Sequence, residues 1–368
     1  MKHATMGEAP AVGFENEAFA EKSFRGKLAV SKALAKNWRA CYFSFKADLK
    51  ARHEIHGFKN WYQCAQICES CMARKDVRSP PGLNFRNFDP NSAAWMETMI
   101  DHPTFIAMGG SSPWQCMEGW TLATTTWDWM HNVYLGVGRD LLGSGLRLLI
   151  ERGVFGPNPR LNEVLSEVQA QMVRDCRQRG LPLPKKPALA WTSIGGDDDY
   201  CEMSSKFKAV HIKRMVWWLA FKSQEAADSN MDDRVLQTFA TCAYALQRCI
   251  EIQDGGGLVL SLEEAEECYS SLILHLRTYS WLASFHWEER RLLFRMRPKH
   301  HILYHQALQL KEWRINQSVF HCFDQESFLG KIKNICQKCH GRSATRQIYN
   351  RYLLCVAMML EQHRRIVS

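Results

Sequence analysis

The sequence predicts a mostly α-helical protein with a small mixed β portion, and three observations support this fold class. Apolar residues recur at helical spacing in a series of segments from about residue 125 onward. Glycines and prolines stand between these segments, where helices are expected to end. The one clear period-two pattern, ACYFSFKADLK, lies near residue 45. Any sheet is therefore expected in the first third of the chain.

The first third combines this strand with loops. Cys41, Phe43 and Phe45 alternate with smaller or polar neighbours, and the strand is expected to end at Asp48. The preceding stretch LAVSKALAKNW could form a short helix. Prolines and glycines are frequent over residues 76 to 118, so this stretch is expected to hold loops and short helices.

The rest of the chain reads as a series of helices. The segment MHNVYLGVGRDLLGSGLRLLIERG predicts a helix that Gly153 stops, and Asn162 is expected to cap the next helix, which ends at Gly180. Ser261 and Glu264 form a capping box for a later helix. Further helical patterns cover residues 204–226, 232–253, 262–284 and 343–365.

Length and composition narrow the class of protein. The 368 residues suffice for one large domain or two ordinary ones. No run of eighteen apolar residues occurs and charged residues fill the first thirty, so neither a membrane span nor a secretory signal is expected. The fourteen cysteines are scattered, which is typical of reduced thiols in an intracellular protein. We expect a nuclear or cytoplasmic protein that is not secreted.

Positive charge is concentrated at the carboxy-terminal end. Residues 286 to 368 hold fifteen Lys and Arg against six Asp and Glu, a surplus equal to the net charge of +9 for the whole chain. Such a segment predicts an anionic partner, with DNA the first candidate. A solvated basic face without a partner is the open alternative.

An acid and an imidazole stand in the apolar stretch TTWDWMHNVYLGVG. Asp128 and His131 are three residues apart, so they share a face if the segment is helical, and both could reach one metal ion or one water. The alternative is a capping Asp followed by a buried, hydrogen-bonded His.

The segment RMRPKHHILYH is basic and rich in histidine. His301 and His305 are four apart, a spacing that can place two imidazoles on one metal ion. Contact with phosphate is a second interpretation, and an exposed helix end is a third. The candidate phosphate-binding residues are Arg295, Arg297, Lys299 and His300.

Two cysteine motifs could bind zinc. Cys68 and Cys71 form a CxxC in CAQICESC, and CQKCH supplies Cys336, Cys339 and His340. Thiolates at this spacing can bind Zn²⁺, but a closed site needs four ligands. The two motifs complete one site only if the fold brings them together. CQKCH also matches the c-type haem attachment pattern. That attachment needs an exported protein, and no secretory signal is expected here, so a haem is not expected.

A further acidic residue begins a carboxy-terminal segment, FDQESFLGKIKNI. Glu326 lies in the expected first turn of a helix, where a carboxylate is favoured electrostatically, so capping is the simple interpretation. The functional interpretation is a metal-binding carboxylate, with Lys331 and Lys333 available for phosphate.

Taken together and in this order, several segments resemble one family. DWMHNVYLGV, RPKHHILYH and FDQESFLGKIKNICQKCHGRSATRQIYNRYLLC are similar to segments of transposases of the CACTA (EnSpm and Plavaka-like) superfamily, and KADLKARHEI with CESCMARK is similar more loosely. The set spans about residues 45 to 356. The resemblance implies a DNA transposase with an RNase H-like core and a helical insertion before the last catalytic acid.

The resemblance also implies roles for particular residues. Three carboxylates of such a core hold two Mg²⁺ ions for phosphoryl transfer. Glu326 matches the last acid and Asp48 the second, whereas Asp128 and His131 organise the core. The implied regions are a partial RNase H-like region with the CxxC (1–125), a helical insertion (126–310) and basic helices that return to the core (311–368). No convincing first acid precedes Asp48, so a truncated or domesticated copy is expected.

The sequence therefore favours a transposase-derived protein that binds DNA, with a vestigial site for Mg²⁺-dependent cleavage or strand transfer. The alternative is a non-enzymatic interaction protein that binds nucleic acid or zinc. A helical enzyme with a His/Asp metal site is a third interpretation. DNA is the expected partner and no membrane partner is expected, while a homo-oligomer is left open.

Overall fold

The computed structural model describes residues 17–20, 23, 43–75, 82–156, 160–337, 339 and 344–367. The chain divides into two compact units, residues 1–320 and residues 321–368. Each unit is described by itself. The short helix expected in LAVSKALAKNW, residues 28–38, lies outside the described residues.

Two short parallel strands form the sheet of the first unit. Strand β1 (Phe45–Ala47) pairs in register with β2 (Thr125–Trp127), so that Ala47 lies opposite Trp127. β1 ends as predicted, because Asp48 leaves the strand and caps helix α3 (Leu49–His56). The described residues are mostly helical with this small parallel sheet, which confirms the prediction of a mostly helical chain with a small β portion.

Short helices and loops fill the region between the two strands, as predicted. The helices are η2 (Ala94–Glu97), α4 (His102–Ala107) and η3 (Pro113–Cys116). Phe105 of α4 packs in a small apolar cluster with Phe58, Trp120 and Leu122, and Trp114 of η3 packs against it. This cluster fixes the loops around β1 and α3.

The glycine-rich segment after β2 is helical throughout. It begins with a π-helix, η4 (Met130–Val137), and continues as α5 (Gly138–Glu151). Its glycines have a packing reason. A Cβ at Gly143 would come within 2.6 Å of the Glu202 backbone, and one at Gly145 would strike the Phe239 ring. These small residues let neighbouring segments approach α5 closely.

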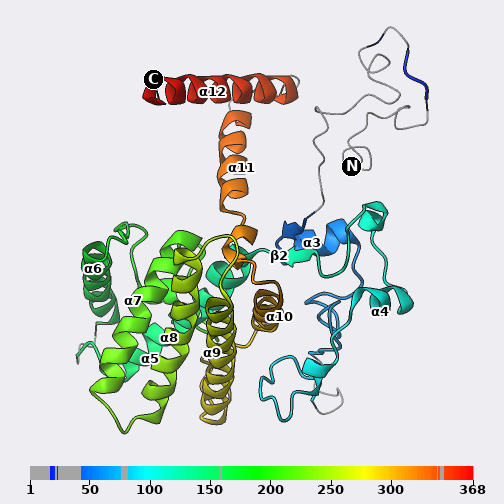
Figure 1. Ribbon diagram of the computed structural model, residues 1–368. Coiled ribbons are helices and arrows are strands. Elements are labelled where there is room, and N and C mark those ends of the chain that lie inside the picture. Colours follow the sequence, from blue (N-terminus) through cyan, green and yellow to red (C-terminus); the bar gives the residue numbers. More distant parts are fainter. Residues whose placement is uncertain are drawn as a thin grey trace. The chain divides into compact units, whose positions relative to one another are not determined.

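Five longer helices follow and form most of the core. They are α6 (Leu161–Gln178), α7 (Ala209–Asp228), α8 (Arg234–Gly255), α9 (Leu262–Glu288) and α10 (Pro298–Trp313), with short helices η5 (Trp191–Ile194) and η6 (Gln317–Phe320). Helices α7, α8 and α9 pack side by side, and α10 packs against α9 and η4 (Figure 1).

The predicted helix starts can be compared with the structure. The capping box at Ser261 and Glu264 is confirmed, with both reciprocal hydrogen bonds present. The predicted cap at Asn162 is wrong. α6 already begins at Leu161, and the Asn162 carboxamide oxygen instead accepts a hydrogen bond from the Trp191 N–H at 2.9 Å.

The second unit contains α11 (Phe323–Cys336) and α12 (Ala344–Val367). The Phe328 and Tyr352 rings meet edge to face between these two helices, with centroids 5.1 Å apart. Among the described helices of the whole chain, none combines the length and the apolar character needed to cross a lipid bilayer.

Candidate metal centre and adjoining cavity

Two cysteines and two histidines from distant parts of the chain converge in the first unit. Cys68 and Cys71 lie in a tight loop, where the Gln66 side chain donates hydrogen bonds to both cysteine carbonyls at 3.1 and 3.0 Å. His301 and His305 lie one turn apart on α10. The four ligand atoms all lie within 4.8 Å of one another.

The distances within this Cys2His2 cluster suit tetrahedral coordination. Cys71 Sγ lies 3.3 Å from His301 Nε2 and 3.5 Å from His305 Nε2. Cys68 Sγ lies 3.4 Å from His305 Nε2, and the two Nε2 atoms are 3.0 Å apart. Ligand bonds of about 2.0 to 2.3 Å around a tetrahedral zinc ion imply ligand separations of roughly 3.3 to 3.8 Å. The cluster could therefore hold a metal ion with little adjustment.

The electrostatics of the cluster also suit a cation. Burial lowers the pKa of His301 to about 4, so its imidazole is neutral and keeps a lone pair for a metal. Burial acts to raise the pKa of the Cys68 thiol, but hydrogen bonding to Cys71 and the neighbouring histidines hold it well below its ordinary value. Burial and the adjacent Cys68 raise the pKa of the Cys71 thiol well above the ordinary value of a cysteine. A bound cation would favour two thiolates.

Aromatic rings surround the cluster. The Trp95 ring packs against His301 with centroids 4.5 Å apart, and the Trp127 ring stacks on His305 at 5.6 Å. The Nδ1 atoms of both histidines are buried and have no hydrogen-bond partner among the described residues. Ring packing therefore orients these imidazoles, where many metal sites use a carboxylate or carbonyl partner.

Two predictions that the sequence analysis kept apart meet in this cluster. His301 and His305 supply the third and fourth donor atoms beside Cys68 and Cys71. Cys336 and Cys339 belong to the second unit, where Cys339 Sγ donates to the Ile335 carbonyl at 3.2 Å. His340 lies outside the described residues. The four-residue spacing of the histidines was visible in the sequence, but their pairing with cysteines more than 200 residues away was not.

A cavity of about 340 Å³ adjoins the strand ends. Asp48 follows β1 and Asp128 follows β2, so the in-register parallel pair delivers both acids to the same edge of the sheet. Both line the cavity, together with His131, Arg297 and Lys299. Ligand sites of parallel sheets commonly form beyond the carboxyl ends of the strands.

Both acids also make local hydrogen bonds. Asp48 Oδ1 accepts from the Ala51 N–H at 2.7 Å as the cap of α3. Asp128 is buried, its Oδ1 accepts from the Met130 N–H at 3.0 Å, and its Oδ2 pairs with His131 Nδ1. Asp128, just before the π-helix, and His131, in its first turn, share a face as predicted and contact each other directly. Such pairing fits the core-organising role that the resemblance implies.

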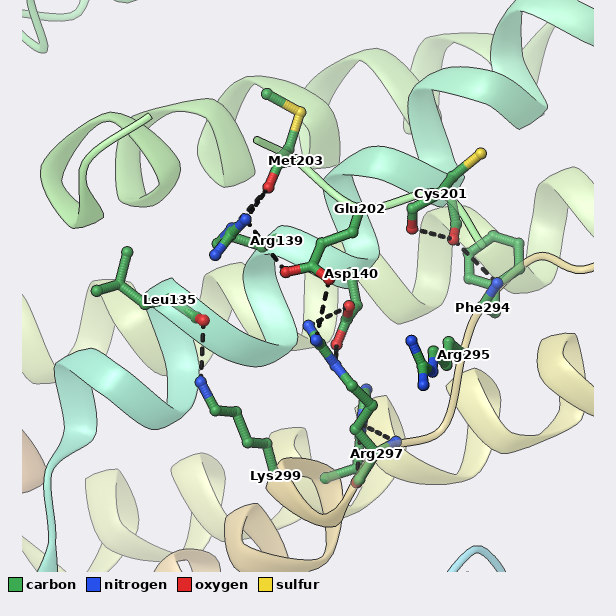
Figure 2. Close-up of polar contacts among 12 residues, drawn as sticks. Leu135, Arg139, Asp140, Cys201, Glu202, Met203, Phe294, Arg295, Arg297 and Lys299 are labelled. Atoms are coloured by element: carbon green, nitrogen blue, oxygen red, sulfur yellow. Dashed lines mark hydrogen bonds and ion pairs between the residues drawn. The ribbon is translucent and has the colours of Figure 1, made fainter. Parts of the chain in front are cut away.

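Two of the predicted phosphate-binding residues make internal contacts beside this cavity (Figure 2). Arg297 pairs with Asp140 through two nitrogens and donates to Glu202 at 3.0 Å, and Arg139 reaches Glu202 at 3.2 Å. The Lys299 ammonium donates to two carbonyls of the π-helix, at 2.7 Å to His131 and 3.0 Å to Leu135. This network fixes the start of α10 to η4 and α5.

Burial shifts the pKa values of two charged groups in this network. It raises the pKa of Asp140 to about 7, although the Arg297 charge acts to lower it. It lowers the pKa of Lys299 to about 8. Of the other two predicted residues, His300 is buried against the Tyr279 ring at 4.4 Å, and Arg295 is exposed and lies over the Tyr200 ring at 5.4 Å.

The remaining predicted residues lie in the second unit. Glu326 is in the first turn of α11 and its side chain is exposed, as are those of Lys331 and Lys333 one and two turns later. A carboxylate in that first turn is consistent with the capping interpretation as well as the catalytic one.

Comparisons of the chain with protein-family models, with curated proteins and with solved structures gave no match. The chemistry of the site is therefore inferred from its own donor atoms, burial and charges.

Proposed function

We propose that the chain is a transposase-derived DNA-binding protein. It carries part of an RNase H-like core, with a vestigial phosphoryl-transfer site that includes Asp48. The observation that carries this proposal is the placement of Asp48 and Asp128 at matching ends of two paired parallel strands, facing one cavity. A carboxylate at such a strand end is suited to bind Mg²⁺ through oxygen ligands.

The Cys2His2 cluster supports the proposal because it ties the core to the helical region. It joins the loop after α3 to α10, which are more than 200 residues apart in sequence. Two thiolates and two neutral imidazoles are the donor set that structural Zn²⁺ prefers, and every position is filled by protein. The zinc ion would hold Cys68, Cys71, His301 and His305 together and would take no part in the chemistry.

A charge-neutral substitution separates the catalytic role of Asp48 from its role as a cap. Asn caps helices about as well as Asp, so Asp48→Asn keeps the hydrogen bond to Ala51 and removes the charge. We expect it to abolish Mn²⁺ binding at the cavity and any Mn²⁺- or Mg²⁺-dependent nicking of DNA. Binding is measured by electron paramagnetic resonance of Mn²⁺, and nicking on supercoiled DNA.

Asp101→Asn is the matched control, because Asp101 caps α4 through the same bond, accepting from the Thr104 N–H at 2.8 Å. Equal Mn²⁺ binding by both variants and the parent chain would show that Asp48 is only a cap. Phosphate contacts also make DNA affinity fall as the salt concentration rises. If the parent chain binds DNA with the same affinity at low and high salt, the proposed phosphate contacts are wrong.

The second candidate is a non-enzymatic zinc- and nucleic-acid-binding protein. It is favoured by the structural duties of the cavity residues, since Asp48 caps a helix, Asp128 pairs with His131 and Lys299 holds the π-helix. DNA binding without Mn²⁺ binding at Asp48 selects this candidate over the first.

A further inference from the structure

A second group of basic residues lies at the end of α6, in the linker that follows it and just before α7, far in sequence from the basic carboxy-terminal end. Seven cationic side chains there are exposed, and none takes part in an ion pair between described residues. They are Arg174, Arg177, Arg179, Lys185, Lys186, Lys206 and Lys208. The nearby acid Asp175 accepts a hydrogen bond from Trp218 Nε1 at 2.9 Å, which ties its carboxylate to α7.

We name these seven residues, with the segments that carry them, the α6–α7 basic face. The two helices pack against each other (Figure 1). The linker between them is held on α6, because Gln169 Nε2 donates to the carbonyls of Lys185 and Pro187 at 3.1 and 3.0 Å. Arg214 on α7 donates to the linker carbonyl of Pro182. Burial and the charges of Arg214 and Lys208 together lower the pKa of His211, so positive charge gathers at this point.

Aromatic rings line the same face. Trp217 and Phe221 are one turn apart on α7, and their rings are parallel with centroids 6.2 Å apart. The Arg179 guanidinium lies over the Trp217 ring at 5.8 Å, which joins the aromatic pair to the basic residues. Phe221 is 48% exposed although it is a large apolar residue. Its outer side is available to a planar ligand group.

We propose that the α6–α7 basic face binds single-stranded DNA, with phosphates at the seven cations and an unpaired base stacked on Phe221. This inference rests on the proposed DNA-binding function and locates it on the helical region. Uncompensated cations attract a phosphate backbone, and an exposed aromatic ring accepts a base only when that base is unpaired. The unpaired cations and the exposed aromatic ring occur together on this face. A solvated face without a ligand would explain the cations but gives no reason for the exposed ring.

The charge part is tested with the full chain and a fluorescein-labelled single strand, by anisotropy at increasing KCl. The variant Arg174→Gln/Arg177→Gln/Arg179→Gln removes three cations from the basic face. We expect the slope of log affinity against log salt to fall by about 2, since each phosphate contact on a single strand contributes about 0.7. The control Arg234→Gln/Arg248→Gln/Arg277→Gln removes equal charge from α8 and α9. An equal change in both variants overturns the proposal.

The stacking part uses Phe221→Ala and the conservative Phe221→Trp. We expect Phe221→Ala to weaken single-strand binding about tenfold, Phe221→Trp to restore it, and duplex binding to stay unchanged under both. If Phe221→Ala leaves single-strand affinity intact, the assignment to unpaired bases is wrong. A parent chain that binds no DNA overturns the proposed function as well, whereas a DNA-binding parent with unaffected face variants overturns this inference alone.

Discussion

Two clusters of buried histidine meet at α10 and differ in what surrounds them. His300 and His301 are neighbours on this helix, but His301 faces Cys71 at 3.3 Å whereas His300 packs on the Tyr279 ring. The first cluster brings two sulfurs and two imidazoles to one point. The second combines His300 with His275 and His286, all buried among aromatic rings.

The second cluster shows why burial alone does not make a metal site. His275 Nδ1 donates to the Cys242 carbonyl at 2.9 Å, and the Cys242 sulfur lies 3.4 Å from the same nitrogen. That cysteine–histidine contact resembles one edge of the Cys2His2 cluster. No third donor of the described residues completes a set there. A metal centre therefore depends on the convergence of several donors, whereas a lone buried imidazole serves as packing.

Loss of a thiol from the Cys2His2 cluster should have the largest effect. Cys71→Ser leaves three ligands and a buried hydroxyl, so we expect bound zinc to fall from one equivalent to none. The free energy of unfolding should fall by more than about 5 kcal/mol, because metal affinity contributes directly to folding. Elemental analysis and urea unfolding measure the two quantities.

Cys242→Ser is the matched control for this experiment, since it removes a buried sulfur that also contacts a histidine. We expect it to keep its zinc. Loss of zinc from Cys242→Ser, or full zinc retention in Cys71→Ser, would remove the distinction between the clusters.

Breaking the ion pairs at the start of α10 should have the next largest effect. Arg297→Met leaves the buried Asp140 without its guanidinium, which we expect to cost about 3 kcal/mol at pH 8.5, where this carboxyl is ionised in the parent. Burial already raises the pKa of Asp140 to about 7. Without Arg297 that pKa rises further, so the stability difference from the parent should widen as pH increases above about 7.

Urea unfolding at pH 6 and pH 8.5 measures this widening. Adding Asp140→Asn to Arg297→Met replaces the carboxylate by a neutral amide and should remove the pH dependence. A constant difference between the two pH values would mean that Asp140 is not the group responsible.

The sequence predicted most helices because their signals are local. The capping box at Ser261 and the strand that ends at Asp48 depend on residues within a few positions of each other, and both are confirmed. The prediction at Asn162 failed because it also used only local sequence. An Asn near a helix start has the same local sequence whether it caps the helix or accepts a hydrogen bond from Trp191. Only the three-dimensional neighbour decides between the two.

The candidate metal centre could be only half predicted from the sequence. CxxC and the spacing of His301 and His305 each suggested metal binding, but joining them requires α10 to return to the loop after α3. Likewise, Arg297 and Lys299 look like phosphate ligands in a basic segment, and the structure gives them carboxylate and carbonyl partners. Sequence shows what a side chain can bind, whereas long-range packing determines what it meets.

The histidine of the second cluster should give a smaller effect that depends on pH. Burial lowers the pKa of His275 to about 4, below its ordinary value of 6.5. The neutral imidazole therefore contributes stability above pH 6.5 that is lost as the pH falls toward 4, up to about 3 kcal/mol. We expect His275→Gln to reduce the loss of stability over this range.

His211→Gln is the control, because burial also lowers the pKa of this imidazole but the side chain is only half-buried. Denaturant unfolding at several pH values between 7 and 4 compares the variants. Identical slopes for His275→Gln and the parent would exclude His275 from acid unfolding.

The smallest effect is expected at the start of α9, the helix that carries His275 and His286. Ser261 Oγ accepts from the Glu264 N–H at 3.1 Å, so Ser261→Ala should cost about 1 kcal/mol of stability. Ser261→Thr keeps the cap and should restore it. Because the metal ligands lie on α10 and the CxxC loop, zinc content should not change in either variant. If Ser261→Ala lowers the zinc content, the two histidine clusters are coupled through α9. They could then no longer be compared as independent parts of the molecule.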